Sequence, residues 1–401
     1  MHQSQQTHNY QPFVAIMLVC LIFFILVYSN LFLDHKDRQP NGSKRVLVTG
    51  AAGFIGFHLS LQLTKTSASI IVAMDNFNDY YDVQLKIDRA YELHKAGVKV
   101  YYADLCDLAF IEKLFAAYNF THVIHLGAQA GVRYSLENPL AYVHSNIEGT
   151  QVILDTVKKY PNIHLTYASS SSVYGKNSPI PFHLNADTDH PGNMYAATKR
   201  ANELMAYQHC TSTGIKSVGL RFFTVYGPWG RPDMAVYKFA QSIVEGKKVP
   251  MFKVSGDEEL GRDFTYIDDI IAGILSTMDY NPDCCGVVFN LGFGHSVSVP
   301  ELITILEEEL GQNAELDLLP LPPTEILQTW ADISVSRQHL GFKPVTALQD
   351  GVRKFIEWFT QYHQLRDKLQ KSGQMSAAQQ WYNELVQKTT TVHNASDWKS
   401  A

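Results

Sequence analysis

The chain has 401 residues, of which 46% are hydrophobic, so it can bury the core of one large domain or of two closely packed ones. Its formal net charge is −6 and it has no run of basic residues. It therefore lacks the concentrated positive face that nucleic-acid binding requires. The five cysteines have neither metal-ligand nor disulfide-framework spacing. We expect no metal site, and we expect the adjacent Cys284 and Cys285 to be structural thiols.

An uncharged apolar stretch runs from Phe13 to Leu33. At about 1.5 Å per residue, a helix of this length crosses a hydrocarbon core of about 30 Å. A cleaved signal peptide would have a basic start, a shorter apolar run and a small-residue cleavage site, and the sequence has none of these. A buried core helix would not precede a polar linker. We expect a tail over 1–12, a transmembrane anchor over 13–33 and a linker over 34–43.

The orientation of this anchor stays open at the level of sequence. Residues 1–12 lack Lys and Arg, whereas four basic residues follow the span, namely Lys36, Arg38, Lys44 and Arg45. The positive-inside rule would therefore place the large domain in the cytosol. Three N-x-S/T triplets, at Asn41, Asn119 and Asn394, permit a lumenal domain instead.

From residue 44 onward, short apolar runs alternate with longer helix-like stretches. This alternation predicts an α/β fold with parallel βαβ units in a doubly wound, Rossmann-like sheet over 44–226. The candidate strands are 45–49, 69–75, 98–103, 121–126, 163–169 and 218–223. Frequent prolines then predict a smaller substrate-binding lobe over 227–366, interleaved with the first domain. The polar segment 367–401 is expected to be a peripheral helix or a loose tail.

The first candidate strand leads directly into the turn Gly50-Ala51-Ala52-Gly53-Phe54-Ile55-Gly56. Glycines at a strand-to-helix turn let the backbone approach a pyrophosphate, whose charge then lies at the helix N-terminus. Asp75 ends the second strand, where it is placed to bind ribose hydroxyls. Its charge would repel a 2′-phosphate, which favours NAD over NADP. Asp104 follows the third strand and is placed to reach the adenine edge.

Tyr195 and Lys199 are four residues apart in a helix-like segment, which puts both side chains on one face. A tyrosine with a reference pKa of ~10 is a poor base, but a nearby ammonium and a positive nicotinamide ring would stabilise its phenolate. The serines of 169–172 follow the fifth strand, at the edge of the sheet where α/β ligand sites form. Taken singly, these features also fit a surface pair and a strand terminus.

In this order, the glycine turn, the serine-rich strand end and the Tyr-x-x-x-Lys pair resemble the extended short-chain dehydrogenase/reductase superfamily. Tyr174 lies 21 residues before Tyr195, a spacing similar to that of its nucleotide-sugar epimerases. The finer resemblance is to UDP-glucuronate 4-epimerases. It is carried by the segments Asp75–Tyr81, Ala128–Tyr134, Arg221–Met234 and Arg262–Asp269, and it fades near Tyr362.

This resemblance implies that UDP-glucuronate and UDP-galacturonate interconvert through oxidation at C4′ by bound NAD. It also implies a homodimer in the Golgi or ER, with a lumenal domain slightly preferred. The implied catalytic residues are Ser170, Tyr195 and Lys199. The implied cofactor contacts are Gly50, Gly53, Phe54, Ile55, Gly56, Asp75, Asp104, Leu105, Leu126, Tyr195 and Lys199. The implied substrate contacts are Arg133, Ser171, Ser172, Thr224, Arg231 and Arg262.

The uronic acid adds a chemical difficulty, because its carboxylate is β to the transient ketone and the intermediate can lose CO₂. A planar, bidentate guanidinium is suited to holding that carboxylate away from the aligned geometry. Arg231, in a Pro/Gly-rich loop, is the candidate for this clamp, and Arg262 is the candidate for the UDP phosphates. Three departures from the family pattern are Gly127 in place of Ala, Pro323-Thr324-Glu325 in place of Gly-Asp, and no acid in Pro181–Leu184.

Four other functions remain as alternatives. A UDP-glucuronate decarboxylase begins with the same oxidation, and a UDP-glucose or UDP-N-acetylhexosamine 4-epimerase would prefer neutral sugars. A 4,6-dehydratase is disfavoured because Ser171 and Ser172 stand where its acidic pair would be needed. A membrane-held NAD-binding scaffold or sensor would be expected to lack Tyr195 or Lys199, and both are present.

Overall fold

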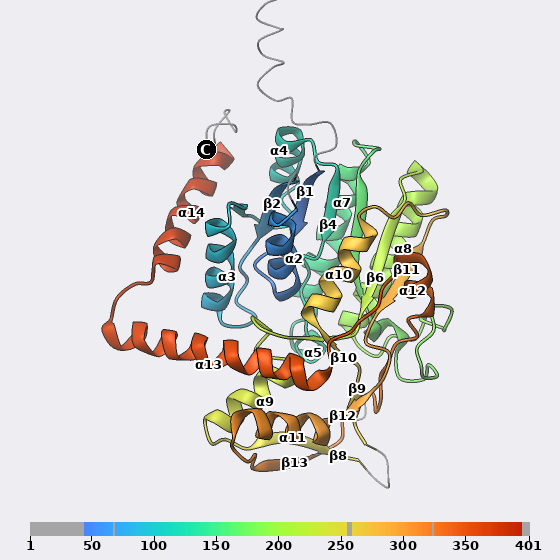
Figure 1. Ribbon diagram of the computed structural model, residues 1–401. Coiled ribbons are helices and arrows are strands. Elements are labelled where there is room, and N and C mark those ends of the chain that lie inside the picture. Colours follow the sequence, from blue (N-terminus) through green and yellow to red (C-terminus); the bar gives the residue numbers. More distant parts are fainter. Residues whose placement is uncertain (1–43, 67–68, 255–258, 323–324, 395–401) are drawn as a thin grey trace, which may run out of the picture. The chain divides into compact units, whose positions relative to one another are not determined.

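The computed structural model describes residues 44–66, 69–254, 259–322 and 325–394 (Figure 1). The expected tail, anchor and linker over 1–43 lie outside these residues. None of the helices that the model describes is both long and apolar enough to cross a bilayer.

The centre of the fold is a seven-stranded parallel sheet with the order β11-β6-β5-β4-β1-β2-β3. This order places the first strand inside the sheet and is that of a doubly wound Rossmann-like fold, as predicted. All six predicted strands are present, to within a residue or two at their ends. The strands are β1 (Lys44–Thr49), β2 (Ser69–Asp75), β3 (Lys99–Tyr102), β4 (His122–His125), β5 (His164–Ser170), β6 (Ser217–Phe222) and β11 (Val287–Leu291).

Helices cover both faces of this sheet because successive strand residues point to opposite sides. In β1, Val46 and Val48 belong to the core on one face, and Leu47 belongs to the core on the other. The first face carries α2 (Phe54–Thr64), α3 (Val83–Lys95) and α10 (Ile267–Thr277), and the second carries α4 (Leu108–Tyr118), α7 (Gly149–Val157) and α8 (Met194–Thr213). Between β4 and α7 lie α5 (Tyr134–Glu137), α6 (Pro139–Tyr142) and the π-helix η1 (Val143–Glu148), and the 3-10 helix η2 (Ser171–Tyr174) follows β5.

A second group of elements lies beyond the carboxyl ends of the strands (Figure 1). Its small sheets pair β7 (Thr224–Tyr226) with β10 (Phe264–Tyr266), β9 (Gly261–Arg262) with β12 (Val297–Ser298), and β8 (Val249–Lys253) with β13 (Leu316–Pro320). Its helices are α9 (Ala235–Val244), α11 (Val299–Leu310) and the first half of α13 (Leu348–Ser372). The chain also returns to the main sheet, through β11 and the adjoining α12 (Ser334–Leu340).

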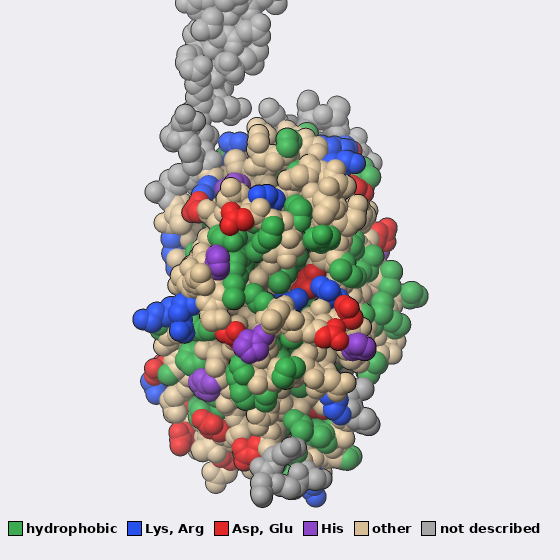
Figure 2. Space-filling model, turned by 90° about the vertical axis from the view of Figure 1, so that its right-hand side faces the viewer, with side chains coloured by type: hydrophobic (Ala, Val, Ile, Leu, Met, Phe, Trp, Pro, Cys, Tyr) green, Lys and Arg blue, Asp and Glu red, His purple; other side chains and the backbone are tan. Residues whose placement is uncertain are grey.

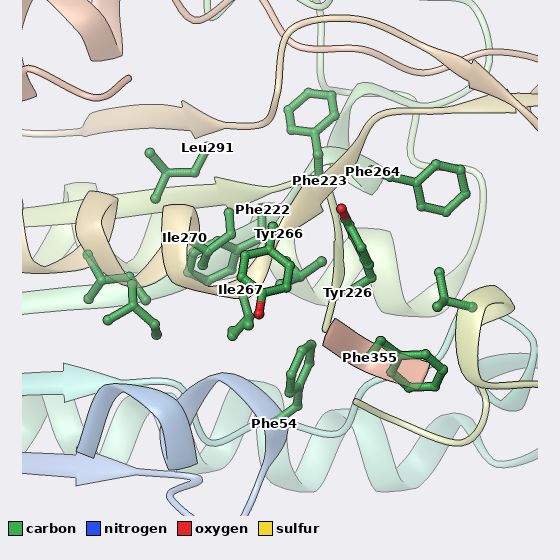
Figure 3. Packing of buried hydrophobic residues seen from close by; sticks show 14 of the residues in the cluster. Phe54, Phe222, Phe223, Tyr226, Phe264, Tyr266, Ile267, Ile270, Leu291 and Phe355 are labelled. Carbon is green, nitrogen blue, oxygen red and sulfur yellow. The ribbon is translucent and has the colours of Figure 1, made fainter. Parts of the chain in front are cut away.

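One hydrophobic core joins the two groups (Figure 3). Phe54 of the glycine turn is only 5% exposed and belongs to the same cluster as Ile267 of α10 and Phe355 of α13. The end of the glycine turn therefore packs in one core with residues that lie more than 200 positions later in the chain. The second lobe cannot move freely against the sheet without breaking this shared core.

The structure corrects the expectation for the cysteines. Cys285 forms a disulfide with Cys210, across a sequence separation of 75 residues, and Cys284 is exposed with a free thiol. The pairing follows from the topology, because Cys210 lies near the end of α8 and Cys285 precedes β11, which pairs with β6 directly after α8. The prediction that Cys284 and Cys285 are structural thiols was wrong. The spacing of the cysteines in the sequence does not indicate that Cys210 and Cys285 lie side by side in the fold.

Candidate active site

A cavity of about 1200 Å³ lies at the carboxyl ends of the strands, between the main sheet and the second lobe. Every residue that the sequence analysis assigned to catalysis, cofactor or substrate lines this cavity. The fold thus gathers side chains that are spread from Gly50 to Arg262 in the sequence. It matches the general placement of ligand sites in open parallel sheets.

The glycine turn connects β1 to α2 within very little space. Gly50 has a φ of +66°, and a Cβ there would lie 2.7 Å from the backbone of Gly127. A Cβ on Gly56 would lie 2.3 Å from the carbonyl oxygen of Gly50. Both positions therefore require glycine. Gly127 is less constrained, because the nearest atom to a Cβ there, at 2.9 Å, is the end of the Leu105 side chain, which can shift.

Asp75 sits at the end of β2, with its carboxylate held in place by two backbone amides. It accepts hydrogen bonds from Ala52 N at 3.0 Å and Phe77 N at 2.8 Å. An acceptor fixed in this way retains lone pairs for ribose hydroxyls. Asp75 and the glycine turn are the residues that would hold the adenosine and pyrophosphate of NAD, and their arrangement fits that cofactor.

Asp104 lies beside this pocket, at the end of β3. Burial alone would raise its pKa, but hydrogen bonds from Cys106 N and the Asn76 amide lower it, so the side chain is an ionised acceptor. Asp104, Cys106 and His144 bring ligand-type atoms within 4.8 Å of one another. Of the three, only Asp104 lines the cavity, so we assign Asp104 alone to the cofactor pocket.

Tyr195 and Lys199 lie in the first turns of α8, whose start is fixed by a hydrogen bond from Ala196 N to the Asn193 side chain. Lys199 is 4% exposed and donates to the carbonyl oxygen of Ala168 in β5 at 3.0 Å. One turn later, Glu203 accepts a 2.6 Å hydrogen bond from Ser169. These contacts fasten α8 to the end of β5.

The electrostatics of the pair differ from the expectation. Burial lowers the pKa of Lys199 to about 8. Burial also raises the pKa of Tyr195, although a hydrogen bond with Ser170 and the charge of Arg231 act in the opposite direction. The protein groups alone therefore favour the protonated tyrosine. A positive nicotinamide, when bound, would act in the opposite direction and stabilise the phenolate.

Arg231 reaches the same cavity with its side chain only 21% exposed. Its Nε donates to Asp233 Oδ1 at 3.0 Å and its Nη2 donates to Asp233 Oδ2 at 2.5 Å. The Tyr80 hydroxyl also donates to Asp233 Oδ2, at 2.9 Å. Burial would raise the pKa of Asp233, but the guanidinium lowers it, so the pair is ionic. Asp233 occupies one edge of the guanidinium and leaves the Nη1–Nη2 end for another carboxylate.

Two more cations line the cavity, Arg262 from the second lobe and Arg133 from the loop between β4 and α5. Arg262 is 19% exposed and makes a short hydrogen bond to the Glu325 carboxylate, and Arg133 lies 3.8 Å from the other oxygen of that carboxylate. Residues 323–324 are outside the described part of the chain, but Glu325 sits where the sequence departs from the family pattern. It bridges the two arginines that the sequence assigned to substrate.

The sequence analysis missed three residues of this site. The only sequence feature that points to Asp233 is its position two residues after Arg231. Tyr80 lies 153 residues before Asp233, its hydrogen-bond partner. Arg89 is fully buried and donates both to Ala52 O, in the glycine turn, and to Trp229 O, in the Arg231 loop. It links the cofactor turn to the carboxylate-binding loop, and no local pattern marks it.

Comparison with known proteins agrees with this arrangement. Residues 46–292 match the model of the NAD dependent epimerase/dehydratase family. The chain belongs to this family. UDP-glucuronate 4-epimerase 3 of Arabidopsis thaliana is 46% identical over 331 residues, which cover 79% of this chain and 77% of that protein. UDP-glucuronate 4-epimerase 4 of the same plant is 44% identical over 338 residues, which cover 81% of this chain and 77% of that protein.

Solved structures of this family superpose well. The UDP-glucuronic acid 4-epimerase of Bacillus cereus, in complex with UDP-glucuronic acid and NAD, has a TM-score of 0.73 and 34% identity, covering 79% of this chain and 99% of its own. The UDP-glucose 4-epimerase of Thermotoga maritima, with UDP-glucose, has a TM-score of 0.71 and 27% identity, with the same coverage of both chains. Members with charged and with neutral sugars thus share this fold.

Proposed function

We propose that this protein is an NAD-dependent UDP-glucuronate 4-epimerase, which interconverts UDP-glucuronate and UDP-galacturonate. The observation that carries the proposal is the position of Arg231. Its guanidinium lies in the same cavity as Tyr195, close enough for its charge to act on the phenol. A neutral hexose has no charged group to pair with a cation at this position, whereas a uronic acid has a carboxylate that the guanidinium can bind.

The residues divide the reaction among them. NAD, when bound, accepts and returns the hydride at C4′. Tyr195 takes the proton of the 4′-hydroxyl and later gives it back, while Ser170 holds the same oxygen by a hydrogen bond. Lys199, fixed on Ala168 O, is placed to hold the nicotinamide ribose. The 4-keto sugar turns over between the two transfers, so the cavity must release its ring while the nucleotide stays bound.

Arg262 and Arg133 keep the nucleotide in place during this rotation. Arg262 belongs to the second lobe, Arg133 packs over Phe252 of that lobe, and both contact Glu325. A diphosphate is a better partner for two arginines than one carboxylate. Arg231 holds the uronate carboxylate out of alignment with the ketone, which suppresses loss of CO₂.

Product analysis tests the proposal directly. The full-length protein is incubated with UDP-glucuronate and the products are followed by NMR. UDP-galacturonate is expected, and Tyr195→Phe should abolish its formation. UDP-pentose and CO₂ as the main products would establish a decarboxylase, and faster turnover of UDP-glucose would establish a neutral-sugar epimerase. Product formation that persists in Tyr195→Phe would overturn the catalytic assignment.

The protein is further proposed to be a single-pass membrane protein of the Golgi or ER, anchored through 13–33, with its catalytic domain in the lumen. The disulfide between Cys210 and Cys285 supports the lumenal side, because disulfides persist in oxidising compartments. The basic residues that follow the span favour a cytosolic domain instead, and we give the disulfide more weight. Asn119 is exposed and suits a glycosylation test. A mass shift on glycosidase treatment that disappears in Asn119→Gln is expected, and protease sensitivity of the domain in intact microsomes would contradict a lumenal location.

A homodimer is proposed from an exposed apolar face. Leu136 of α5 and Leu140 of α6 are 66% and 75% exposed, and Leu204 and Tyr207 of the neighbouring α8 are 52% and 51% exposed. Figure 2 looks at the side of the molecule that carries α8, and hydrophobic side chains gather across the middle of that face. Leu140→Glu with Leu204→Glu should yield monomers in sedimentation analysis. The matched control, Leu365→Glu at a 57% exposed position of α13, should leave the dimer intact.

A further inference from the structure

The C-terminal segment folds back onto the cofactor-binding half of the molecule. α13 ends at Ser372, Gly373 turns the chain with a φ of +67°, and α14 (Ala377–Asn394) runs along α3 and β3 (Figure 1). The Bacillus cereus enzyme is matched over almost its whole length, yet that match covers only 79% of this chain. Residues 1–43 cannot account for all of the remainder. This chain therefore carries structure in addition to the shared fold.

The contact made by α14 is apolar and local. Ala378 is 6% exposed and belongs to a small cluster with Ala52, Phe77, Ile87 and Ala90, against which Trp381, Tyr382 and Leu385 pack. The Tyr382 ring lies 5.0 Å from that of Phe77, and the Trp381 ring stacks on His94 at 5.2 Å. A helix of largely polar composition is thus held by one aromatic stripe.

Two members of this cluster hold a residue of the cofactor pocket in place. The backbone amides of Ala52 and Phe77 are the two donors that fix the Asp75 carboxylate. Phe77 has a φ of +51°, a left-handed conformation that is unfavourable for a residue with a Cβ and persists only where the surrounding structure imposes it. The rings of Tyr382 and Tyr102 both pack against its ring and against each other. Asp75 is near enough to act on the Tyr382 hydroxyl.

We propose that α14 is a brace for the adenosine-binding turn 75–77, and that Tyr382 is its positioning residue, so that the C-terminal helix slows the release of NAD. Tyr382 does not contact the cavity; it acts through Phe77, whose conformation orients the ribose-binding carboxylate. An enzyme that regenerates its cofactor in each cycle gains from slow release, because lost NAD ends turnover.

The test measures NAD release from the full-length protein without any sugar. Protein loaded with NAD is diluted, and free NAD is followed with time by an enzymatic cycling assay. Tyr382→Ala should release NAD about tenfold faster, in line with the loss of one aromatic pair and its burial. Tyr382→Phe, which keeps the ring, should behave as the wild type. At saturating NAD the kcat of Tyr382→Ala should be unchanged.

The matched control is Glu384→Ala, an exposed position on the same helix. Equal release from Tyr382→Ala and wild type would overturn the proposal, and so would equal acceleration by Glu384→Ala. If Tyr382→Ala does not fold, Tyr382→Leu, which fills part of the same space, should show an intermediate release rate; a wild-type rate there would also overturn it. Because the assay contains no UDP-sugar, a wrong substrate assignment would leave its result unaffected.

Discussion

Asp233 holds one edge of the Arg231 guanidinium, with Nε–Oδ1 and Nη2–Oδ2 distances of 3.0 and 2.5 Å. The remaining end of the guanidinium is aimed by this pairing, since a planar fork with one edge fixed cannot rotate about its own axis. The acid also cancels one charge next to the place where the substrate carboxylate must lie. Asp233 should therefore orient the Arg231 guanidinium toward the substrate carboxylate but weaken its electrostatic attraction for that carboxylate.

The variant Asp233→Asn separates these two effects. We expect the KM for UDP-glucuronate to stay level or fall, because a like charge near the substrate is removed. The fraction of UDP-pentose among the products should rise, because the carboxylate is held less well. NMR product ratios and initial rates measure both quantities. An unchanged pentose fraction would show that Asp233 does not orient the clamp, and exposed Asp189→Asn provides the control.

Removal of the guanidinium itself should change specificity more than chemistry. Arg231→Gln should lower kcat/KM for UDP-glucuronate by about 100-fold, as expected for the loss of a charge-assisted hydrogen bond of about 2–3 kcal/mol. Turnover of UDP-glucose should fall much less, because that sugar has no carboxylate to hold and loses only the effect of the Arg231 charge on Tyr195. A parallel fall for both sugars would indicate that Arg231 acts on the fold of the loop instead.

Lys199 is expected to destabilise the fold at neutral pH. Its pKa is about 8 in the folded protein, against an ordinary value of 10.5 for a lysine. Between pH 8 and pH 10.5 the unfolded chain binds a proton that the folded chain releases, so the free energy of unfolding rises with pH. Below pH 8 both states are protonated, and the folded protein bears the full cost of burying the charge. The cost is of the order of 3 kcal/mol, less about 1 kcal/mol for the hydrogen bond to Ala168 O. Lys199→Met should thus be inactive but melt at a higher temperature at pH 7.

This gain should shrink as the pH approaches 10. Thermal melts of wild type and Lys199→Met at pH 7 and pH 9.5 measure it. A variant that melts lower than the wild type at pH 7 would contradict the prediction. The buried ammonium would then be compensated by contacts in the folded protein.

The disulfide should stabilise the domain by restricting the unfolded chain over the long loop that it closes. A closed loop of 75 residues corresponds to about 4 kcal/mol in the chain-entropy model. Cys210→Ser with Cys285→Ser should lower the melting temperature by several degrees, and a reducing agent should have no further effect on that variant. Cys284→Ser, one residue away and free in the structure, should melt as the wild type. Destabilisation by Cys284→Ser alone would mean that a different pair is bonded.

The sequence predicted the parts of the fold that depend on local pattern. The six strands from β1 to β6 were recognisable because each is a short apolar run before a turn. β11 was missed, because its five residues follow a proline- and cysteine-containing turn in an irregular segment. The glycine and serine motifs at strand ends and the Tyr-x-x-x-Lys spacing predicted part of the cavity lining, and the family resemblance supplied the arginines.

What could not be predicted depends on contacts between distant segments. Tyr80 meets Asp233, Arg89 meets Trp229, and Cys210 meets Cys285 only after the sheet has formed. α14 was expected as a peripheral helix or a loose tail, because a helix that buries a single aromatic stripe has a polar average composition. Its docking site, centred on Phe77, is a property of the folded turn.

β11 has a consequence for how the molecule is made. It pairs with β6 along its whole length, and it is supplied by residues 287–291, well after the second lobe begins. A fragment that stopped at Tyr226 would present β6 as an open edge, a template for pairing with other chains. The nucleotide-binding half therefore lacks its edge strand when it is made alone. During synthesis, β11 can pair with β6 only after a large part of the second lobe has left the ribosome.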